Sequence, residues 1–261
     1  MLKTIKYELK KSRTFILIFL LLYVLLEGAL IIGVALNKET LSSVSFALFF
    51  ALGFGATIFV LTAQVLGYSR ELRDKSGYLV FMTPLSSRRI LGAKLLTTLV
   101  CAAILGAFAG LLQVFNYQLI AKQFHLESVP VILNMALSEL NTSVEEILLI
   151  AITWIVYMFI SCAYFVCLSF FAISLSATLL QNKRGKGIIA GIIFLVLFIL
   201  FEVITSHLPQ INVYETAAMV DSVEYGKGFI LANLPGIVFQ VLCSIACWAG
   251  SAWLLDNRIS L

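Results

Sequence analysis

Long apolar runs alternate with short polar segments along this chain. Five runs clearly exceed the roughly 20 residues that a helix needs to cross the hydrocarbon core of a bilayer, and a sixth just reaches that length. The six runs lie at residues 14–36, 44–68, 95–120, 147–180, 188–206 and 230–255. This pattern predicts an all-α, polytopic membrane protein with six transmembrane helices in a single transmembrane domain over residues 1–261.

The run at 147–180 raises the alternative of two spans. Two crossings would need about 40 residues and a turn, whereas this run has 34 residues and contains neither Pro nor Gly. Ser143 and Glu146, spaced as in a capping box, indicate where its helix begins. We expect one span here.

The composition agrees with a bilayer environment, because 61% of the residues are hydrophobic and only 12% are charged. An ordinary soluble domain has about half its residues apolar and about a quarter charged. The net charge of +4 would suggest an acidic partner such as nucleic acid, but the charged residues lie almost wholly between the apolar runs. We therefore expect membrane lipid as a partner, and no nucleic acid.

The basic residues predict the orientation. With six spans and a cytoplasmic N-terminus, 15 of the 18 basic residues fall on the cytoplasmic side, and Lys38, Lys122 and Lys227 fall outside. Since cytoplasmic segments carry the excess of Lys and Arg, both termini are expected in the cytoplasm.

The segment at residues 1–13 has an amphipathic pattern, with an apolar face of Leu2, Ile5 and Leu9 opposite a face of lysines and Arg13. This pattern predicts a short interfacial helix before the first span. The alternative is a basic flank that only sets the orientation of the chain.

Motifs for catalysis and cofactor binding are missing from the sequence. It contains no G-x-x-x-x-G-K-[ST], no G-x-S-x-G and no H-E-x-x-H, and its two histidines lie in predicted outer loops. The five cysteines all lie inside apolar runs, where we expect them to pack as small hydrophobes. Cys243 and Cys247 share a helix face that could hold a soft metal ion, but no His or Met stands beside them. We expect no catalytic, cofactor or metal site on this chain.

A few polar residues lie inside the predicted spans. Glu27 and Glu202 are the costliest, because a carboxylate at the centre of a bilayer costs about 2.5–3.5 kcal/mol on insertion scales. Gln64, Gln113, Asn116 and Gln240 are milder cases. Each either makes an interhelical hydrogen bond or serves a transport path or subunit contact. Glu27, Gln64 and Glu202 are our candidates for the path or contact.

Small residues recur at every fourth position in four spans and predict faces where helix backbones approach closely. These stripes are Ala47, Ala51 and Gly55; Ala102, Gly106 and Gly110; Gly187 and Gly191; and Ala246 and Gly250. Spacing does not tell whether the neighbouring helices belong to the same chain or to a second copy.

The polar segment between the second and third runs is the most informative one. Residues 68–96 read YSRELRDKSGYLVFMTPLSSRRILGAKLL. This segment resembles the loop between spans two and three of type-2 ABC transporter permeases. The matching positions are Glu71, Ser76-Gly77 (where Gly-Thr is more usual), Tyr78 to Met82, Pro84, Ser86 to Arg89, Gly92 and Lys94. The opening KYELKKSRTFILIF, with Glu8, is similar to the entry helix of that family.

The resemblance implies a half-transporter in the plasma membrane of a bacterium. Two such permeases, identical or related, would pair and rest on a cytoplasmic ATPase that holds ATP and Mg²⁺, so this chain itself would not be an enzyme. The implied function is export of an amphipathic substrate: a peptide, a lipid-like molecule or a drug.

The loop at 69–94 would be the coupling loop to the ATPase. Its implied contact residues are Glu71, Arg73, Tyr78, Leu79, Phe81 and Met82. The large apolar ones would fill a cleft of the ATPase, and Glu71 would be a charge exposed at its rim. The alternative is that the apolar residues dip into the membrane interface.

Two other classes of protein remain open from the sequence. One is a non-transport membrane scaffold or a protein that confers peptide resistance by sequestration. The other is a secondary transporter, whose helices are often broken by Gly or Pro at mid-membrane. The four prolines here are expected in loops or at a span end.

The charge distribution generates a topology prediction. Reporter fusions after Lys11, within residues 70–90 and after Arg258 should report the cytoplasm, and fusions near residues 125 and 220 should report the outside, because the basic residues divide 15 to 3 between the two sides. A reporter that is active outside the cell at residue 184 would contradict the six-span arrangement.

Overall fold

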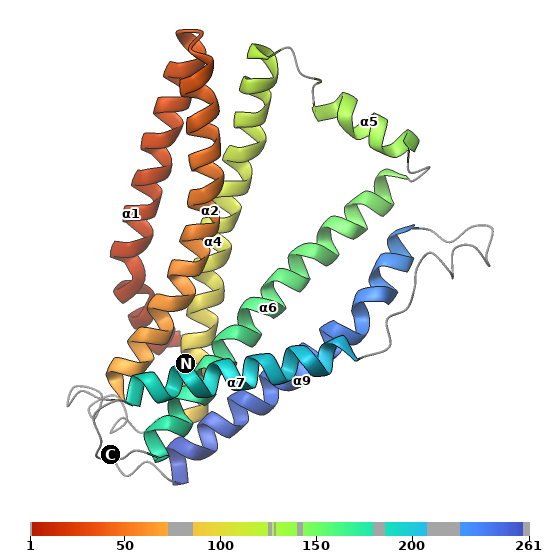
Figure 1. The fold of residues 1–261 in the computed structure, drawn as a ribbon. Helices are drawn as coiled ribbons and strands as arrows, with labels where there is room; N and C mark the ends of the chain where they lie inside the picture. Colours follow the sequence, from red (N-terminus) through yellow and green to blue (C-terminus); the bar gives the residue numbers. More distant parts are fainter. Residues whose placement is uncertain are drawn as a thin grey trace. The chain divides into compact units, whose positions relative to one another are not determined.

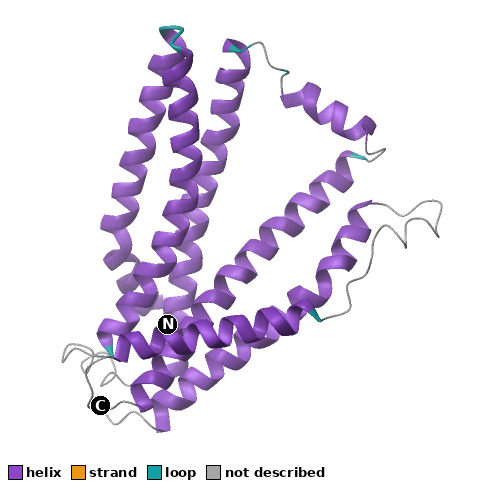
Figure 2. Cartoon of the chain, in the orientation of Figure 1, coloured by secondary structure: helices purple, strands orange, loops and turns teal. Residues whose placement is uncertain are grey.

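The computed structural model describes residues 2–72, 86–124, 127, 129–139, 143–179, 186–207 and 225–257. All regular structure in these residues is helical (Figures 1 and 2), which confirms the all-α prediction. The helices are α1 (Leu2–Ala35), α2 (Glu39–Glu71), α4 (Ser87–Gln123), α5 (Val129–Glu139), α6 (Val144–Leu179), α7 (Lys186–Ser206) and α9 (Tyr225–Asn257).

Six of these helices are long and apolar enough to cross a membrane, with mean hydropathies between 1.9 and 2.9. The exception is α5, whose 11 residues extend about 17 Å and are too short to span. The sequence analysis did not predict α5. The six predicted spans are thus confirmed as helices of the required length and hydropathy within the described residues.

The helices continue past the apolar runs from which the spans were predicted. α2 has 33 residues and a length of about 50 Å, whereas the hydrocarbon core is about 30 Å thick. Backbone hydrogen bonds do not depend on apolar side chains, so polar residues at the ends of a span extend its helix. Consequently residues 69–71 belong to α2 and residues 87–94 to α4, although the sequence suggested a loop at 69–94.

Two other predictions about helix ends can be compared with the structure. The run at 147–180 is one continuous helix, α6, and Ser143 Oγ accepts a hydrogen bond of 3.3 Å from the backbone N–H of Glu146 at its start. Residues 2–13 are helical as predicted, but they form the first turns of α1 without a break before the span.

The chain folds into two compact units. The N-terminal unit comprises Leu2–Ala63 and Leu96–Asn141, and the C-terminal unit comprises Gln64–Leu95 and Thr142–Leu261. α2 and α4 each contribute to both units, since the boundaries fall at residues 63–64 and 95–96.

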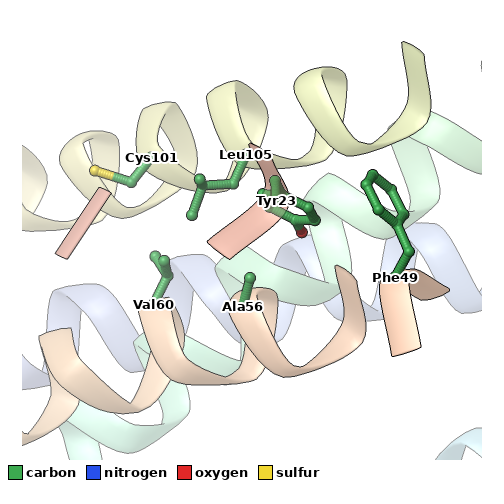
Figure 3. Close-up of a cluster of buried hydrophobic side chains, with 6 residues drawn as sticks. All are labelled: Tyr23, Phe49, Ala56, Val60, Cys101 and Leu105. Atoms are coloured by element: carbon green, nitrogen blue, oxygen red, sulfur yellow. The ribbon is translucent and has the colours of Figure 1, made fainter. Parts of the chain in front are cut away.

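The N-terminal unit has its core where α1, α2 and α4 lie side by side (Figure 1). The Tyr23 ring lies between α2 and α4 (Figure 3), with its centroid 5.1 Å from that of Phe49 and 5.9 Å from that of Phe108. Ala56, Val60, Cys101 and Leu105 complete the buried cluster. Cys101 thus packs as a small hydrophobe, as expected.

A tight turn joins α1 to α2. Asn37 has a φ of 51°, in the left-handed region that Asn adopts more readily than most residues. The N–H of Lys38 donates to the Gly33 carbonyl at 2.9 Å, and the N–H of Asn37 donates to the Val34 carbonyl at 3.1 Å. These two bonds form a Schellman motif, which ends α1 and reverses the chain within a few residues.

The C-terminal unit is built on α6, which packs against α7 and α9. Its buried core consists of Tyr164, Cys167 and Leu168 on α6 and Cys247 on α9. Phenylalanines from α7 surround this core, so that Cys167 and Cys247 also pack as hydrophobes.

Pro235 lies near the beginning of the last span, as expected, but α9 starts before the span and so encloses it. It lies inside α9, where it cannot donate the hydrogen bond that would reach the Leu231 carbonyl. α9 changes direction along its length (Figure 1), as expected of a helix with an internal proline. Pro130 lies in the first turn of α5, a position that proline tolerates.

The small-residue stripes have different surroundings. A Cβ on Gly250 would lie 2.8 Å from the Phe171 ring, so α6 and α9 approach closely there, as the stripe predicted. A Cβ on Gly55, Gly106 or Gly191 would meet no atom within 4 Å. At those glycines, the stripes contact no neighbouring helix within the described part of the chain.

The turn between α1 and α2 should not tolerate a larger residue at Gly33. A Cβ there would lie 2.9 Å from the backbone nitrogen of Ser42, and backbone cannot yield as a flexible side chain can. Gly33→Ala should therefore lower the free energy of unfolding by about 1–3 kcal/mol, measured by thermal unfolding in detergent.

Gly28→Ala is the matched control, because it lies on the same helix and its added Cβ would meet nothing within 4 Å. This control should be neutral or gain up to about 1 kcal/mol from helix propensity. Equal stability of the two variants would mean that the close approach of the turn to Gly33 is absent.

Candidate functional site

A buried ion pair connects the end of α2 to the start of α4. Lys94 Nζ lies 2.9 Å from Oε1 and 2.8 Å from Oε2 of Glu71. The Lys94 side chain is 2% exposed and that of Glu71 is 13% exposed. Ile90, Leu91 and Ala93 are buried around the same turns of α4.

Because both side chains are buried, each of the two charges needs the other as its partner. An ionised lysine or carboxylate removed from water and left alone costs several kcal/mol, so each group holds the other in place. The pair thereby links α2 to α4, the helices on either side of the segment 73–85. The segment 73–85 lies outside the described residues.

Two further polar contacts lie at the same helix ends in the C-terminal unit. Tyr68 and Ser174 share a buried hydrogen bond of 2.6 Å, which joins α2 to α6, and the Tyr68 ring lies 4.6 Å from that of Phe170. Ser87, the first residue of α4, donates a hydrogen bond of 2.5 Å to the Asp256 carboxylate near the end of α9. Together with the ion pair, these contacts form what we call the helix-end cluster.

The helix-end cluster fixes the ends of α2, α4, α6 and α9 around the two points where the segment 73–85 leaves and re-enters the fold. It contains acids, a base and hydroxyl groups, but their hydrogen bonds are made to one another. Its arrangement is therefore suited to holding the ends of these helices together.

The predicted loop contacts fall into two groups. Arg73, Tyr78, Leu79, Phe81 and Met82 lie outside the described residues. Glu71 is described, and it is not the exposed rim charge that we expected. Its carboxylate lies against Lys94 because that lysine, placed on a packed face of α4, needs a partner of opposite charge.

Sequence analysis had included Lys94 only as a position of the loop pattern, and it missed the pairing. One signal was available: a lysine within the apolar sequence of α4, directly before Leu95-Leu96, has no water to face if its helix is packed. What the sequence could not give was the position of Glu71, because a loop of unspecified path separates the two residues.

The polar residues inside the spans have four different environments. The Glu27 carboxylate is buried in the N-terminal unit beside Asn116 of α4. Glu202 is exposed on α7, and Gln64 is partly buried on α2. Gln240 on α9 accepts a 3.2 Å hydrogen bond from Ser161 on α6, so the interhelical alternative is confirmed for that residue.

The structure gives no sign of a metal centre in the part of the chain that it describes. All five cysteines are free thiols, and three of them are buried in the helix packing. Within the described residues, no three His, Cys, Asp or Glu side chains come together in a group that could hold a metal ion.

Comparison with known proteins adds no family to this description. No protein-family model, no curated protein and no solved structure matches the chain.

The ion pair should contribute strongly to stability. Lys94→Met leaves the Glu71 carboxylate buried without its partner and should lower the free energy of unfolding by about 3–5 kcal/mol. Glu71→Gln combined with Lys94→Met removes both charges and should recover most of that loss. Thermal unfolding in detergent, followed by tryptophan fluorescence, measures both effects, and Glu71→Gln alone completes the double-mutant cycle.

Lys122→Met is the control, because Lys122 is also on α4 but is exposed. It should change the free energy of unfolding by no more than about 0.5 kcal/mol. If Lys94→Met were as stable as this control, the pair would not hold the helix ends together.

Proposed function

We propose that this chain is the permease subunit of an ABC exporter, driven by a separate cytoplasmic ATPase. One observation carries the proposal: the pattern of residues 68–96, which resembles the coupling loop of type-2 permeases, spans the ends of two helices, α2 and α4, that are tied to each other by the buried Glu71–Lys94 pair. Both residues of that pair are positions of the pattern.

The helix-end cluster supports a coupling role on physical grounds. A loop that passes motion from an ATPase to membrane helices must not yield at its own base. The pair at 2.8–2.9 Å and the Tyr68–Ser174 and Ser87–Asp256 hydrogen bonds supply such a base. A force applied to the loop would then act together on the ends of α2, α4, α6 and α9.

The loop also has a composition suited to docking. Tyr78, Leu79, Phe81 and Met82 are large apolar residues in a segment that is otherwise charged. Exposing such residues to water is unfavourable, and an apolar cleft on a partner removes that cost. The excess of basic residues places this loop, and both termini, in the cytoplasm, where an ATPase has access to ATP.

A second permease copy follows from the size of the chain. Six helices in two separate units are few to enclose a path for an amphipathic peptide, lipid-like molecule or drug. Gly55, Gly106 and Gly191 contact no neighbour within the described chain, and small residues of this kind are favoured where transmembrane helices of two subunits meet. The pair would be a homodimer or a heterodimer with a related permease in a bacterial plasma membrane.

The decisive experiment is affinity purification from native membranes, with identification of any ATPase subunit that accompanies the chain. Phe81→Asp should reduce the recovered ATPase at least about tenfold, because burial of one aromatic side chain contributes about 1.5–3 kcal/mol. The variant should still insert into the membrane, because residue 81 lies between the spans.

Tyr214→Asp is the matched control. It makes the same aromatic-to-acid change in the loop between α7 and α9, which the six-span topology places on the opposite side of the membrane. The control should retain the ATPase. Equal recovery with both variants would remove the coupling role of the loop, and a wild-type chain that carries no ATPase would favour the scaffold alternative.

A further inference from the structure

The N-terminal unit buries a carboxyl group beside an amide, without a well-formed hydrogen bond between them. Both carboxyl oxygens of Glu27 are inaccessible to solvent, and neither lies in good hydrogen-bond geometry with a donor among the described residues. Asn116 lies beside this carboxyl group, is 0% exposed, and has both polar atoms of its amide unpartnered within the described residues. Two complementary polar groups thus meet inside an apolar unit.

The helices that place these groups are closely packed. Glu27 follows Tyr23 by one turn on α1, and the Tyr23 ring lies between Phe49 of α2 and Phe108 of α4. Asn116 is two turns beyond Phe108 on α4. The carboxyl and amide groups therefore lie where α1 meets α4, within two turns of residues that contact the buried cluster of Figure 3.

No cationic side chain lies between Arg13 and Ala35 of α1 or between Lys94 and Lys122 of α4 to neutralise Glu27. Of these two lysines, Lys94 is paired with Glu71 and Lys122 is exposed. Between the helix ends, the other titratable residues are Tyr23 on α1 and Cys101 and Tyr117 on α4, and α2 contributes none between residues 40 and 63. All three of these groups are neutral when protonated. An ionised Glu27 would therefore be an uncompensated charge, which is costly in a bilayer.

The numbers of hydrogen-bond donors and acceptors on Glu27 and Asn116 favour the protonated state of Glu27. A carboxylate has only acceptors, whereas an asparagine amide has two N–H donors and one carbonyl acceptor. Facing a carboxylate, the Asn116 carbonyl oxygen would have no donor. A protonated Glu27 can donate its O–H to that carbonyl while its own carbonyl oxygen accepts from the Asn116 amide, which leaves neither side chain with an unpartnered acceptor.

We propose that Glu27 and Asn116 form a proton-binding site inside the membrane, in which Glu27 holds a proton in a cyclic acid–amide pair with Asn116. Release of the proton leaves two facing acceptors and one buried charge. The contact between α1 and α4 must then loosen, so the proton acts as a removable link between these two helices. This inference does not depend on the proposed function of the chain.

Infrared spectroscopy of the whole protein in lipid vesicles tests the site directly. A protonated carboxylic acid has a carbonyl stretch that is distinct from the bands of a carboxylate. At neutral pH we expect this band in the wild type and in Glu202→Gln, whose carboxylate is exposed on α7. The band should be lost in Glu27→Gln and shifted in Asn116→Leu, which removes the hydrogen-bonding partner.

Thermal unfolding provides a second measurement that does not depend on Asn116→Leu folding. Glutamine at position 27 can form the same cyclic pair with Asn116 but cannot lose a proton. The wild-type melting temperature should therefore fall by several degrees more than that of Glu27→Gln as the pH rises from about 6 to about 9. Glu202→Gln should follow the wild type over that range.

Two results would overturn the proposal. The first is a wild type that has no protonated-acid band at neutral pH and the same pH dependence of melting as Glu27→Gln. The second is a band that disappears, with a rise in melting temperature, when choline in the buffer is replaced by sodium at the same pH. That result would assign the oxygens of Glu27 and Asn116 to a metal cation instead of a proton.

Discussion

An ionised side chain has no water to stabilise it inside a bilayer or among closely packed helix ends, so each charge placed there needs a compensating group. This constraint explains both polar sites of the molecule. In the C-terminal unit Lys94 is compensated by the Glu71 carboxylate, which lies 2.8–2.9 Å away. Among the described residues of the N-terminal unit no base faces Glu27, and the compensation that we infer is a proton.

The Glu71–Lys94 ion pair and the proton inferred at Glu27 have different mechanical consequences. An ion pair between fixed side chains keeps its two helices together as long as both groups stay charged. A link made through an exchangeable proton can be opened and closed without a change in sequence. α4 takes part in both units and contributes one residue to each link, Lys94 near its start and Asn116 further along the helix.

The sequence predicted the features that depend on the length of apolar runs, such as the spans. It predicted fewer of the features that depend on contacts between helices. All six spans were found because a bilayer imposes a minimum length, and α6 was recognised as one helix from a predominantly apolar run of 34 residues and its Ser143 cap. α5 was missed because 11 residues are too few to be a span. The helix ends at Glu71 and Ser87 were missed because backbone hydrogen bonds continue into polar sequence. The partners of Lys94 and Glu27 required knowledge of which helix faces meet.

The turn at Asn37 has a consequence for the biogenesis of the protein. Only residues 36–38 separate α1 from α2, and the carbonyls of Gly33 and Val34 are already bonded within the turn. No loop is left to be carried across the bilayer on its own. α1 and α2 can therefore leave the ribosome and enter the membrane as a single helical hairpin, and the turn offers little exposed chain to a protease or an antibody at the membrane surface.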